Sequence, residues 1–418
     1  MIKTILILIG GHFALAPRPQ KEAAAAKAAG FTVEVRGCWW DEMLAAEDLE
    51  LAQRMGVTFK PMVDFRPSGP GARNIRVRQR LARELFNRLG IATARSFGMG
   101  GPEILREAIS LAPDFIMVHS EAGLWVAKRL LAKGFRVGVD FEDWFSEDLP
   151  VSDRKGRPVR QLKKLERYLI KNAHLTLATT QVMANALAQD ARSEHTPLAI
   201  PNSFPIVAEF AESVRGDARA EDTVSFYWFS QTIGPGRGLE ALAKAITRLN
   251  GKWELHLRGN LRGYDHWFEE HFPDGIRSKV HLHPCVSNEH LPHHSASHDV
   301  GLALEIPHCP SRDLTATNKI FEYLRCGLAV IASATQGQVE VMNRCPRAGW
   351  VVPPDDIEAI IKAMQECIDD RRGLSLAKRA AREAAGAVWA WQGFHAQLGA
   401  ALVACMRGEE TIPEKSHR

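Results

Sequence analysis

Cysteine is scarce in this chain of 418 residues, and its seven cysteines include no Cys-x-x-Cys pair. An odd number without that spacing argues against a disulfide framework and against a structural zinc site. Long hydrophobic runs are missing as well, since the apolar stretch after Lys3 ends at Ile9, far short of the roughly 20 residues that span a bilayer. We therefore expect a cytoplasmic protein with reduced thiols and without a transmembrane segment or signal peptide.

An excess of one charge is also lacking. The 53 Lys+Arg residues face 49 Asp+Glu residues, which leaves a net charge of +4 and disfavours nucleic acid as a partner. The 45% hydrophobic and 24% charged fractions are typical of a folded globular protein. The length suits two domains of roughly 150 to 200 residues each.

Apolar strands alternate with helices along the first half of the chain. A continuous apolar run from Ile5 to Ile9 ends in paired glycines, and an alanine-rich helix and a second strand follow it. Further strands are expected at 114–120, 136–143 and 175–180. This alternation predicts right-handed crossovers and a doubly wound parallel sheet.

A second alternating series follows a polar stretch that ends at Asp222, which we interpret as a linker. Its expected strands lie at 224–230, 253–259, 279–284, 299–305 and 328–333, and a final helix runs from about Leu374 to Met406. We therefore predict an α/β protein with two Rossmann-like domains, residues 1–203 and 204–388, and a ligand cleft between the carboxyl ends of their sheets. Residues 409–418 form a polar tail.

A glycine-rich loop, Gly234-Pro-Gly-Arg-Gly238, joins a predicted strand to a predicted helix. Its N–H groups and the helix N-terminus can bind a phosphate, and Arg237 can add a planar cation. The spacing fits neither G-x-G-x-x-G nor the P-loop, so it does not support dinucleotide or ATP binding. From the loop alone, a phosphate site and a tight turn with an exposed arginine stay equally open.

The segment TATNKIFEYLRCGLAVIAS, from Thr315 to Ser333, places a second helix start before a buried strand. Unpaired N–H groups near Thr317 can hold a diphosphate, and the Glu322 carboxylate can accept hydrogen bonds from ribose hydroxyls. The alternative is a surface pair between Lys319 and Glu322 at i,i+3. Two helix N-termini that can each bind a phosphate are expected at one cleft, and this favours a ligand site over the surface pair.

Histidines stand at two further places of interest. His119 and Glu121 follow the strand DFIMVHS, where a histidine can hydrogen-bond a ligand or transfer a proton, although a structural role is the alternative. Between residues 281 and 298 two histidine pairs have the i,i+4 spacing that can share a metal, but no H-E-x-x-H pattern is present. We therefore expect no metal among His281, His283, His290, His293, His294 and His298.

A basic amphipathic helix is expected from Arg73 to Leu89, with its apolar residues, Leu89 among them, opposite the arginines. Such a face can lie on an anionic membrane or bind an anionic acceptor, but a solvated basic face is the favoured interpretation. The arginines concerned are Arg73, Arg76, Arg80, Arg83 and Arg88.

Together these pieces resemble the GT-B glycosyltransferases of the group 1 family, which use nucleotide-sugar donors. The strongest part is NKIFEYLRCGLAVIAS with Gln336–Glu340, which is similar to the family's K-x-x-E-x-x-x-x-G-x-P-V-I-A-S donor-binding block. Ile200–Ser203 resembles the P-N-G at its domain junction, and Pro17–Glu22 resembles a loop on the acceptor side. The region of Trp391 resembles the helix that crosses back, here residues 389–408.

This resemblance implies transfer of a sugar from a nucleotide diphosphate to a glycan, lipid-linked or small-molecule acceptor, with no metal or other cofactor and with retention of configuration. It places His119 near the transferred sugar and Arg237 on the phosphates as catalytic residues, and His12, Arg18 and Glu121 on the acceptor side. The implied donor-binding residues are Gly234, Gly236, Arg237, Thr317, Asn318, Lys319 and Glu322.

Two positions depart from the family pattern. Leu314 stands where the family has its first glutamate, and Gln231 stands where it has the first basic residue of a phosphate-binding pair. Arg312 or Asp313 is a candidate substitute for that glutamate. A catalytically degenerate nucleotide-binding module and a sugar-nucleotide epimerase or hydrolase on the same fold stay open as alternatives. Peripheral contact with the inner face of a membrane stays open as well.

Overall fold

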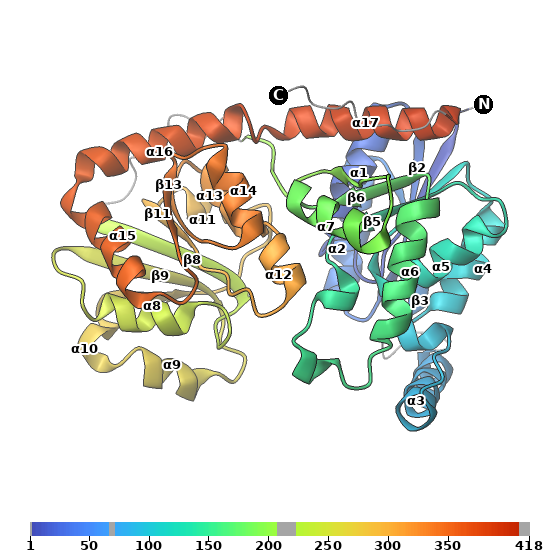
Figure 1. Ribbon diagram of the computed structural model, residues 1–418, viewed down its shortest axis with the longest axis horizontal. Helices are drawn as coiled ribbons and strands as arrows, with labels where there is room; N and C mark the ends of the chain where they lie inside the picture. Colours follow the sequence, from blue (N-terminus) through green and yellow to red (C-terminus); the bar gives the residue numbers. More distant parts are fainter. Residues whose placement is uncertain (1, 67–71, 207–222, 409–418) are drawn as a thin grey trace. The chain divides into compact units, whose positions relative to one another are not determined.

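The computed structural model describes residues 2–66, 72–206 and 223–408 (Figure 1). The chain forms two compact units, one made of Met1–Pro201 with Gly393–Arg418 and the other of Asn202–Gln392. Our domain boundaries at residues 203 and 388 stay predictions. The expected tail and most of the expected linker lie outside the described residues.

The first unit contains a seven-stranded sheet whose strands all pair in parallel, in the order β3-β2-β1-β4-β5-β6-β7. Residues Ile5 to Leu8 of β1 are at most 1% exposed, as a central strand covered on both faces requires. The strands are β1 (Thr4–Leu8), β2 (Thr32–Trp39), β3 (Thr58–Asp64), β4 (Phe115–Val118), β5 (Val137–Phe141), β6 (Leu175–Ala178) and β7 (Leu198–Ala199).

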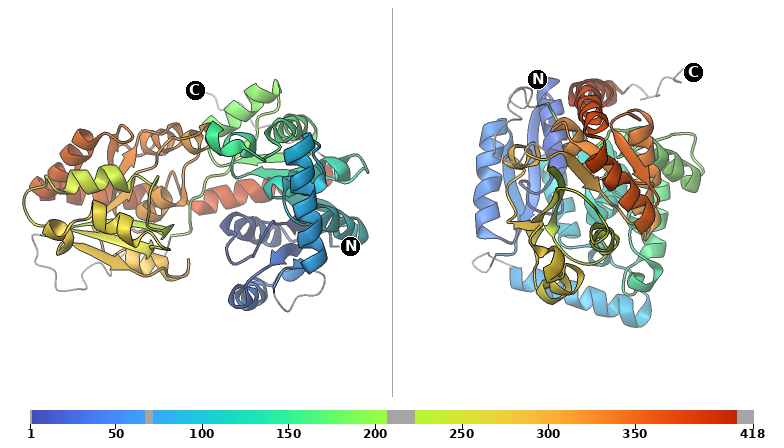
Figure 2. Two further views of the ribbon diagram at one scale, coloured as in Figure 1. Left: turned by 90° about the horizontal axis from the view of Figure 1, so that it is seen from below. Right: turned by 90° about the vertical axis from the view of Figure 1, so that its left-hand side faces the viewer.

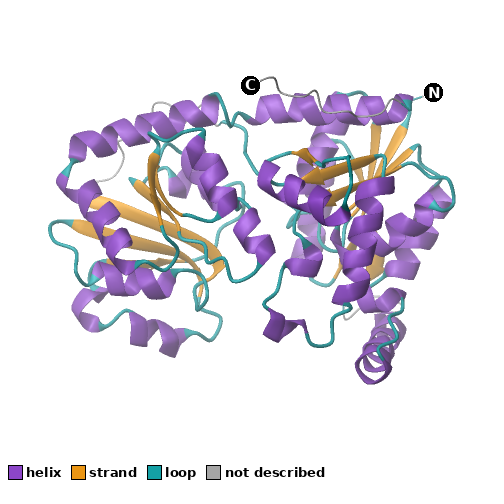
Figure 3. Ribbon diagram, in the orientation of Figure 1, coloured by secondary structure: helices purple, strands orange, loops and turns teal. Residues whose placement is uncertain are grey.

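Helices lie on both sides of this sheet (Figure 3). Short 3-10 turns occur at Ala94–Phe97, Phe145–Glu147 and Val151–Arg154. The helices between strands are α1 (Pro17–Ala28), α2 (Glu42–Met55), α3 (Ala72–Leu89), α4 (Gly101–Leu111), α5 (Ser120–Leu131), α6 (Val159–Asn172) and α7 (Gln181–Ala191).

The second unit has a six-stranded parallel sheet in the order β10-β9-β8-β11-β12-β13. Its apolar core joins the sheet to helices of one face, with Trp228, Leu242 and Met364 fully buried. The strands are β8 (Val224–Thr232), β9 (Trp253–Asn260), β10 (Val280–His283), β11 (Val300–Ala303), β12 (Ala329–Ser333) and β13 (Gly349–Val352).

The helices of the second half of the chain mostly connect these strands, but three of them follow β13, and the last of the three belongs mainly to the first unit (Figure 2). They are α8 (Leu239–Ile246), α9 (Asp265–His271), α10 (Asp274–Arg277), α11 (Leu291–Ser295), α12 (Pro310–Leu314), α13 (Asn318–Arg325), α14 (Gln336–Asn343), α15 (Ile357–Asp369), α16 (Arg371–Gly386) and α17 (Trp391–Arg407). Among the described helices, none combines the length and apolar character that a bilayer span needs.

The prediction of a single helix from Leu374 to Met406 is wrong, because the helix is interrupted between α16 and α17. Trp389 turns inward at the break, packs edge-on against Phe321 at 5.4 Å and lies under the Arg344 guanidinium. Beyond the break α17 packs on the first unit, where Lys3 Nζ and Arg136 Nη1 each donate to the Met406 carbonyl at 2.7 Å. The prediction of a C-terminal helix that returns to the first domain is confirmed.

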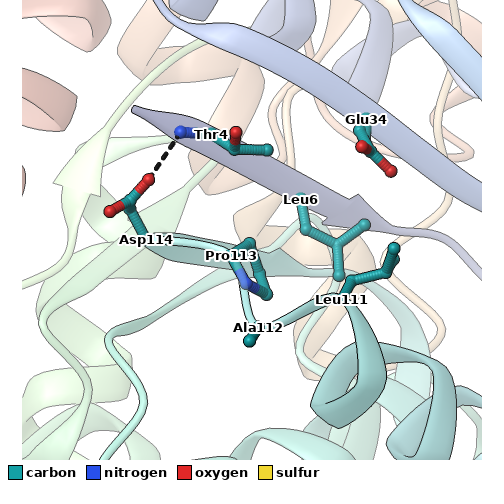
Figure 4. Close-up of a pocket in the computed structure, with 7 residues that line it drawn as sticks. All are labelled: Thr4, Leu6, Glu34, Leu111, Ala112, Pro113 and Asp114. Atoms are coloured by element: carbon teal, nitrogen blue, oxygen red, sulfur yellow. Dashed lines mark hydrogen bonds between the residues drawn. The ribbon is translucent and has the colours of Figure 1, made fainter. Parts of the chain in front are cut away.

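The direction in which strands are added reverses once in each sheet, between β1 and β4 and between β8 and β11. In open α/β sheets, ligands bind outside the carboxyl ends of the strands at such a switch point. A small hollow of about 110 Å³ lies instead at the amino ends of β1 and β2, where Asp114 accepts a hydrogen bond from the Thr4 N–H (Figure 4). The topology therefore predicts ligand sites at the carboxyl ends of the strands in both sheets.

Candidate functional site

A buried ion pair lies near the switch point of the first sheet. The Arg18 guanidinium, from α1, donates to both carboxylate oxygens of Asp140, on β5, at 2.6 and 2.8 Å, and also to the Ile200 carbonyl at 2.7 Å. Asp140 is fully buried and Arg18 is 8% exposed. Arg18, predicted on the acceptor side, therefore joins three segments of the first unit.

His119 follows β4 and forms a second buried pair with Glu22 of α1. Its Nε2 lies 2.9 Å from Glu22 Oε2, and its Nδ1 lies 4.0 Å from a Glu142 oxygen. Burial lowers the pKa of His119, but the charge and hydrogen bond of Glu22 together with the charges of Asp140 and Glu142 outweigh it and raise that pKa to about 9. Burial also raises the pKa of Glu22 to about 7, against the effect of His119. The raised pKa favours the protonated form of His119 at neutral pH.

Within the described structure, each residue of this pair keeps one unused hydrogen-bonding atom. In the described part of the chain, His119 Nδ1 and Glu22 Oε1 are buried and have no hydrogen-bond partner. Ser120, the next residue, has a φ of 69°, which costs a residue other than glycine about 1–3 kcal/mol. A Cβ at Gly10 would lie 3.0 Å from Ser120 Oγ, so the loops after β1 and β4 approach closely at the switch point.

The other two acceptor-side candidates are held by neighbours within the first unit. His12 places Nδ1 2.8 Å from Asp48, and its Nε2 accepts from the backbone N–H groups of Trp40 and Asp41. His12 therefore joins the loop after β1 to α2 through Nδ1 and to the loop after β2 through Nε2. Glu121, in the first turn of α5, forms an ion pair with Arg157.

The glycine-rich loop after β8 lies at the switch point of the second sheet. Gly238 has a φ of 77°, and a Cβ there would lie 2.2 Å from the Leu304 carbonyl oxygen, just after β11. Only glycine fits that position, which brings the loops after β8 and β11 together. Arg237 is exposed and its Nη1 donates to Ser230 Oγ at 3.0 Å, while the Gly236 N–H donates to Glu240 at 2.7 Å. A carboxylate therefore already occupies one N–H of this loop.

A second cation lies close by, at the start of α13. Lys319 Nζ donates to Glu305 Oε1 at 2.7 Å, and Thr317 Oγ1 donates to the same oxygen at 3.0 Å. Burial raises the pKa of Glu305, but the Lys319 charge and the hydrogen bonds from Lys319 and Thr317, with a contribution from Arg312, together outweigh it, so that pKa lies below its usual range. The surface pair considered between Lys319 and Glu322 is wrong, since Lys319 pairs with Glu305.

Glu322 is buried, and Arg325 holds it. Arg325 Nε donates to Glu322 Oε2 at 2.8 Å, and the same guanidinium lies over the Phe204 ring at 4.3 Å. Asn318 is the first residue of the helix that carries Glu322. Just before this helix, the Ala316 carbonyl accepts a hydrogen bond from Asn202 at 3.2 Å, which joins the start of the unit to the candidate site.

The two positions that depart from the family pattern differ in exposure. Leu314 is 7% exposed, whereas Gln231 is exposed. Asp313, a candidate substitute for the missing glutamate, accepts hydrogen bonds from the backbone and side chain of Gln336 at the start of α14. It therefore joins α12 to α14.

Helix α3 is amphipathic as predicted, but one of its apolar residues lies elsewhere than expected. Leu89, expected on the apolar side, is 66% exposed. Arg76, expected on the basic face, donates to the Phe65 carbonyl. Two other apolar residues of this helix are also exposed to solvent. Val77 is 52% exposed and Leu81 is 63% exposed.

Three polar residues of these sites were not among the predicted site residues, namely Glu22, Asp140 and Glu305. Glu305 carries a signal that could have found it, because it follows a buried strand directly, at its carboxyl end. Asp140 is part of an apolar strand, where a buried carboxylate needs a partner. Glu22 ends the segment Pro17–Glu22, and the resemblance of that segment to an acceptor-side loop is the signal that could have found it.

The comparisons with known proteins agree with this fold. Residues 226–370 match the family model described as "Glycosyl transferases group 1". A search of curated proteins gives no match.

Similar solved structures include HepE of Anabaena in complex with UDP and glucose, with a TM-score of 0.66, 15% identity and coverage of 96% of this chain and 100% of that one. Sucrose-phosphate synthase of Thermosynechococcus elongatus has a TM-score of 0.68 at 17% identity and covers 97% and 100%. A glycosyltransferase of Rickettsia africae has a TM-score of 0.66 at 12% identity, and the match covers 97% of this chain and 99% of that one. The second unit thus matches the group 1 glycosyltransferase family model, and the chain shares the fold of these solved structures along its length.

Proposed function

We propose that this protein transfers a sugar from a nucleotide diphosphate sugar to an acceptor held mainly by the first unit. The observation that carries the proposal is the loop at 234–238, which puts an exposed guanidinium beside a helix N-terminus at the switch point of the second sheet. This arrangement suits a diphosphate. HepE was solved with UDP-glucose, which makes UDP the first nucleotide to test.

In the reaction, the bond from the sugar's anomeric carbon to the β-phosphate oxygen breaks, a bond to the acceptor oxygen forms, and the proton of that acceptor oxygen passes to the departing diphosphate. The departing diphosphate carries the developing charge, and fixed cations and N–H dipoles stabilise it. Arg237 and Lys319 are the cations we assign to this task, with the N-termini of α8 and α13. Because the protein supplies these charges, we propose a metal-independent reaction.

Glu240 and Glu305 are anions that already occupy these groups. We propose that the diphosphate displaces the Glu240 carboxylate from the Gly236 N–H, whereas Glu305 keeps Lys319 in place. An exchange of one anion for another leaves the loop's N–H groups paired before and after donor binding.

Glu322 is our candidate for the ribose hydroxyls. Its test compares two anions: Glu322→Gln should weaken binding of UDP, which has a ribose, and leave binding of inorganic pyrophosphate unchanged. Equal weakening of both would refute the ribose role. The conservative change keeps a hydrogen-bonding group against Arg325, since that contact is buried.

His119 is the residue we assign to the sugar side of the reaction. A protonated imidazole with an unused Nδ1–H can donate a hydrogen bond, but it cannot accept a proton as a general base near pH 7. We therefore propose that His119 positions a substrate hydroxyl. Retention of configuration rests on the family resemblance alone.

The outward face of α3 is a candidate for peripheral contact with an anionic membrane that carries a lipid-linked acceptor. Val77 and Leu81 are exposed there among arginines that include Arg73 and Arg80, a combination that suits a headgroup layer. Leu81→Glu should reduce sedimentation with vesicles containing phosphatidylglycerol. The same variant should leave UDP binding unchanged, and unaltered sedimentation would refute the contact.

The decisive experiment is calorimetric titration of UDP, GDP, ADP and dTDP without added metal. We expect selective binding of one nucleotide, and its sugar conjugates are then tested for turnover with and without acceptor. Consumption of donor without acceptor would favour the epimerase or hydrolase. Binding without turnover would favour the degenerate module, and no binding would refute the donor site.

A further inference from the structure

Strands β9 and β10 bring three metal-ligating side chains together, away from the loops described above. Glu254 and His256 lie two residues apart on β9, so their side chains share one face of the sheet. His281 of β10 is the register partner of His256, which places it on the same face. One ligand atom from each of these three residues lies within 4.8 Å of the other two.

The strongest sign of a missing ligand is His281 Nε2. It is a buried atom without a hydrogen-bond partner in the described structure, although it faces a carboxylate and a second imidazole. Burying such a nitrogen without a partner costs about 1–3 kcal/mol. A cation between the three groups removes that cost, because all three can offer lone pairs.

His283, two residues after His281 on β10, supports the same arrangement. Its Nε2 lies 2.9 Å from His256 Nδ1. A cation bound between His256 Nε2 and Glu254, which lie 3.3 Å apart, would replace the proton that Nε2 donates to this carboxylate, while His256 donates from Nδ1 to His283. Metal-ligating histidines characteristically donate the other ring N–H to such a partner, which fixes the tautomer and orients the ring.

The histidine pairs singled out by their spacing do not form this cluster. Helix α11 covers only Leu291–Ser295, so His290, His294 and His298 do not share one continuous helical face. His298 Nδ1 lies 2.6 Å from Ser225 Oγ, and its ring stacks on Tyr227. Cross-strand register, rather than helical spacing, brings the ligands together.

We propose that Glu254, His256 and His281 form a binding site for a divalent transition metal ion of the Zn²⁺ type. Two imidazoles and one carboxylate match that class, whereas Mg²⁺ and Ca²⁺ prefer oxygen ligands only. The Glu254 side chain is 35% exposed, which leaves room for water as a fourth ligand. Zn–N distances of about 2.0–2.1 Å require the two rings, now stacked at 4.7 Å and 23°, to tilt toward a common point.

The charges around the site determine how strongly it is expected to bind a metal ion. Arg258 lies two residues beyond His256 on the same face, but its guanidinium is held by the Tyr227 hydroxyl at 3.0 Å and the Pro284 carbonyl at 2.8 Å. Glu254 supplies the negative charge that a metal needs. A bound ion would join edge strand β10 to β9 in addition to their backbone hydrogen bonds.

The test uses the full chain without a histidine tag, titrated with Zn²⁺ by calorimetry and with Co²⁺ by visible absorption. We expect one ion per chain and Co²⁺ d–d bands of a low-coordinate site. His281→Ala and Glu254→Gln should each weaken binding by roughly 10–100-fold, on the scale of lost metal-site groups. His266→Ala, at an exposed histidine of α9, is the matched control and should bind as the wild type does.

Unchanged Zn²⁺ affinity in both variants, or no Co²⁺ bands, would overturn the site and leave a hydrogen-bonded histidine cluster. Glu254→Gln keeps the proposal testable if His281→Ala fails to fold, because Glu254 is partly exposed. UDP binding should be the same with Zn²⁺ and after chelation. The metal site and the proposed donor site can therefore fail independently.

Discussion

The two units share a doubly wound parallel sheet but arrange charge differently at their switch points. In the first unit the charged groups are buried and matched: Arg18 with Asp140, and His119 with Glu22. In the second, a glycine loop carries an exposed cation, Arg237, whose guanidinium bonds only a serine hydroxyl among the described contacts. The same topology thus supports a rigid network in one sheet and an anion-accepting loop in the other.

This difference separates two tasks that a transferase needs. A buried network of paired charges holds side chains in place but has little net charge left for a ligand. A loop of N–H groups and an exposed cation has charge available, and it gains most when an anion arrives. We therefore place charge stabilisation in the second unit and positioning in the first.

The largest expected effect comes from breaking the network of the first unit. Arg18→Met leaves the Asp140 carboxylate buried and unpaired, which should lower the free energy of unfolding by about 3–5 kcal/mol. Urea unfolding measures it. The double change Arg18→Met with Asp140→Leu should recover much of the loss, since no isolated charge remains.

A surface pair provides the control for this prediction. Arg248 and Glu358 in the second unit are 54% and 72% exposed at their side chains, so Arg248→Met should leave the free energy of unfolding nearly unchanged. Equal losses in Arg18→Met and Arg248→Met would show that the first unit's network is not energetically special.

The next effect tests the available charge of the second unit. Arg237→Ala should lower turnover by about a hundredfold, on the scale of losing one contact to a developing oxyanion, with little change in stability because the residue is exposed. Arg347→Ala is the control, at an exposed arginine just before the amino end of β13. Wild-type turnover in Arg237→Ala would remove Arg237 from the mechanism.

A smaller effect is expected at Lys319. Lys319→Met leaves Glu305 without its cation near the proposed diphosphate site, so UDP affinity should fall about tenfold, or about 1.4 kcal/mol. The double variant with Glu305→Gln should recover part of that loss, and calorimetry on all four proteins gives the coupling. Additive effects would contradict a role for the pair as a unit.

The fold followed from the sequence where strands are continuous apolar runs. Edge strands carried weaker signals: β3 contains Pro61, and β13 begins at Gly349 and is only partly buried, so neither was predicted. The break at 387–390 was missed because nothing local separates α16 from α17. Its cause is the packing of Trp389 on Phe321, a tertiary contact.

At the sites, motifs identified the loops but not the partners of their side chains. Glu22 and His119 are 97 residues apart in sequence, and Arg18 and Asp140 are 122 apart. No local spacing encodes such pairs, because sheet order brings them together. The same holds for His256 and His281, which strand register joins and no motif suggests.

The last prediction concerns the pH dependence of folding stability that arises from His119. Its pKa of about 9 lies above the ordinary 6.5, so the folded state binds this proton more tightly than the unfolded state does. The contribution to stability is therefore complete below pH 6.5 and is lost as the pH rises through 9. The raised pKa of Glu22, about 7 against 4.5, acts in the same direction over a lower range.

Glu22→Gln removes the main charge that raises the pKa of His119 and leaves burial, which lowers it. The His119 ring protons should then titrate at lower pH in NMR spectra, although Asp140 and Glu142 still favour the cation. Unfolding free energies between pH 6.5 and 9 should become less steep. Glu84→Gln, on the surface of α3 beside Arg88, should change neither measurement. A wild-type His119 that titrates near 6.5 would contradict the buried ion pair and return this residue to the role of a neutral base.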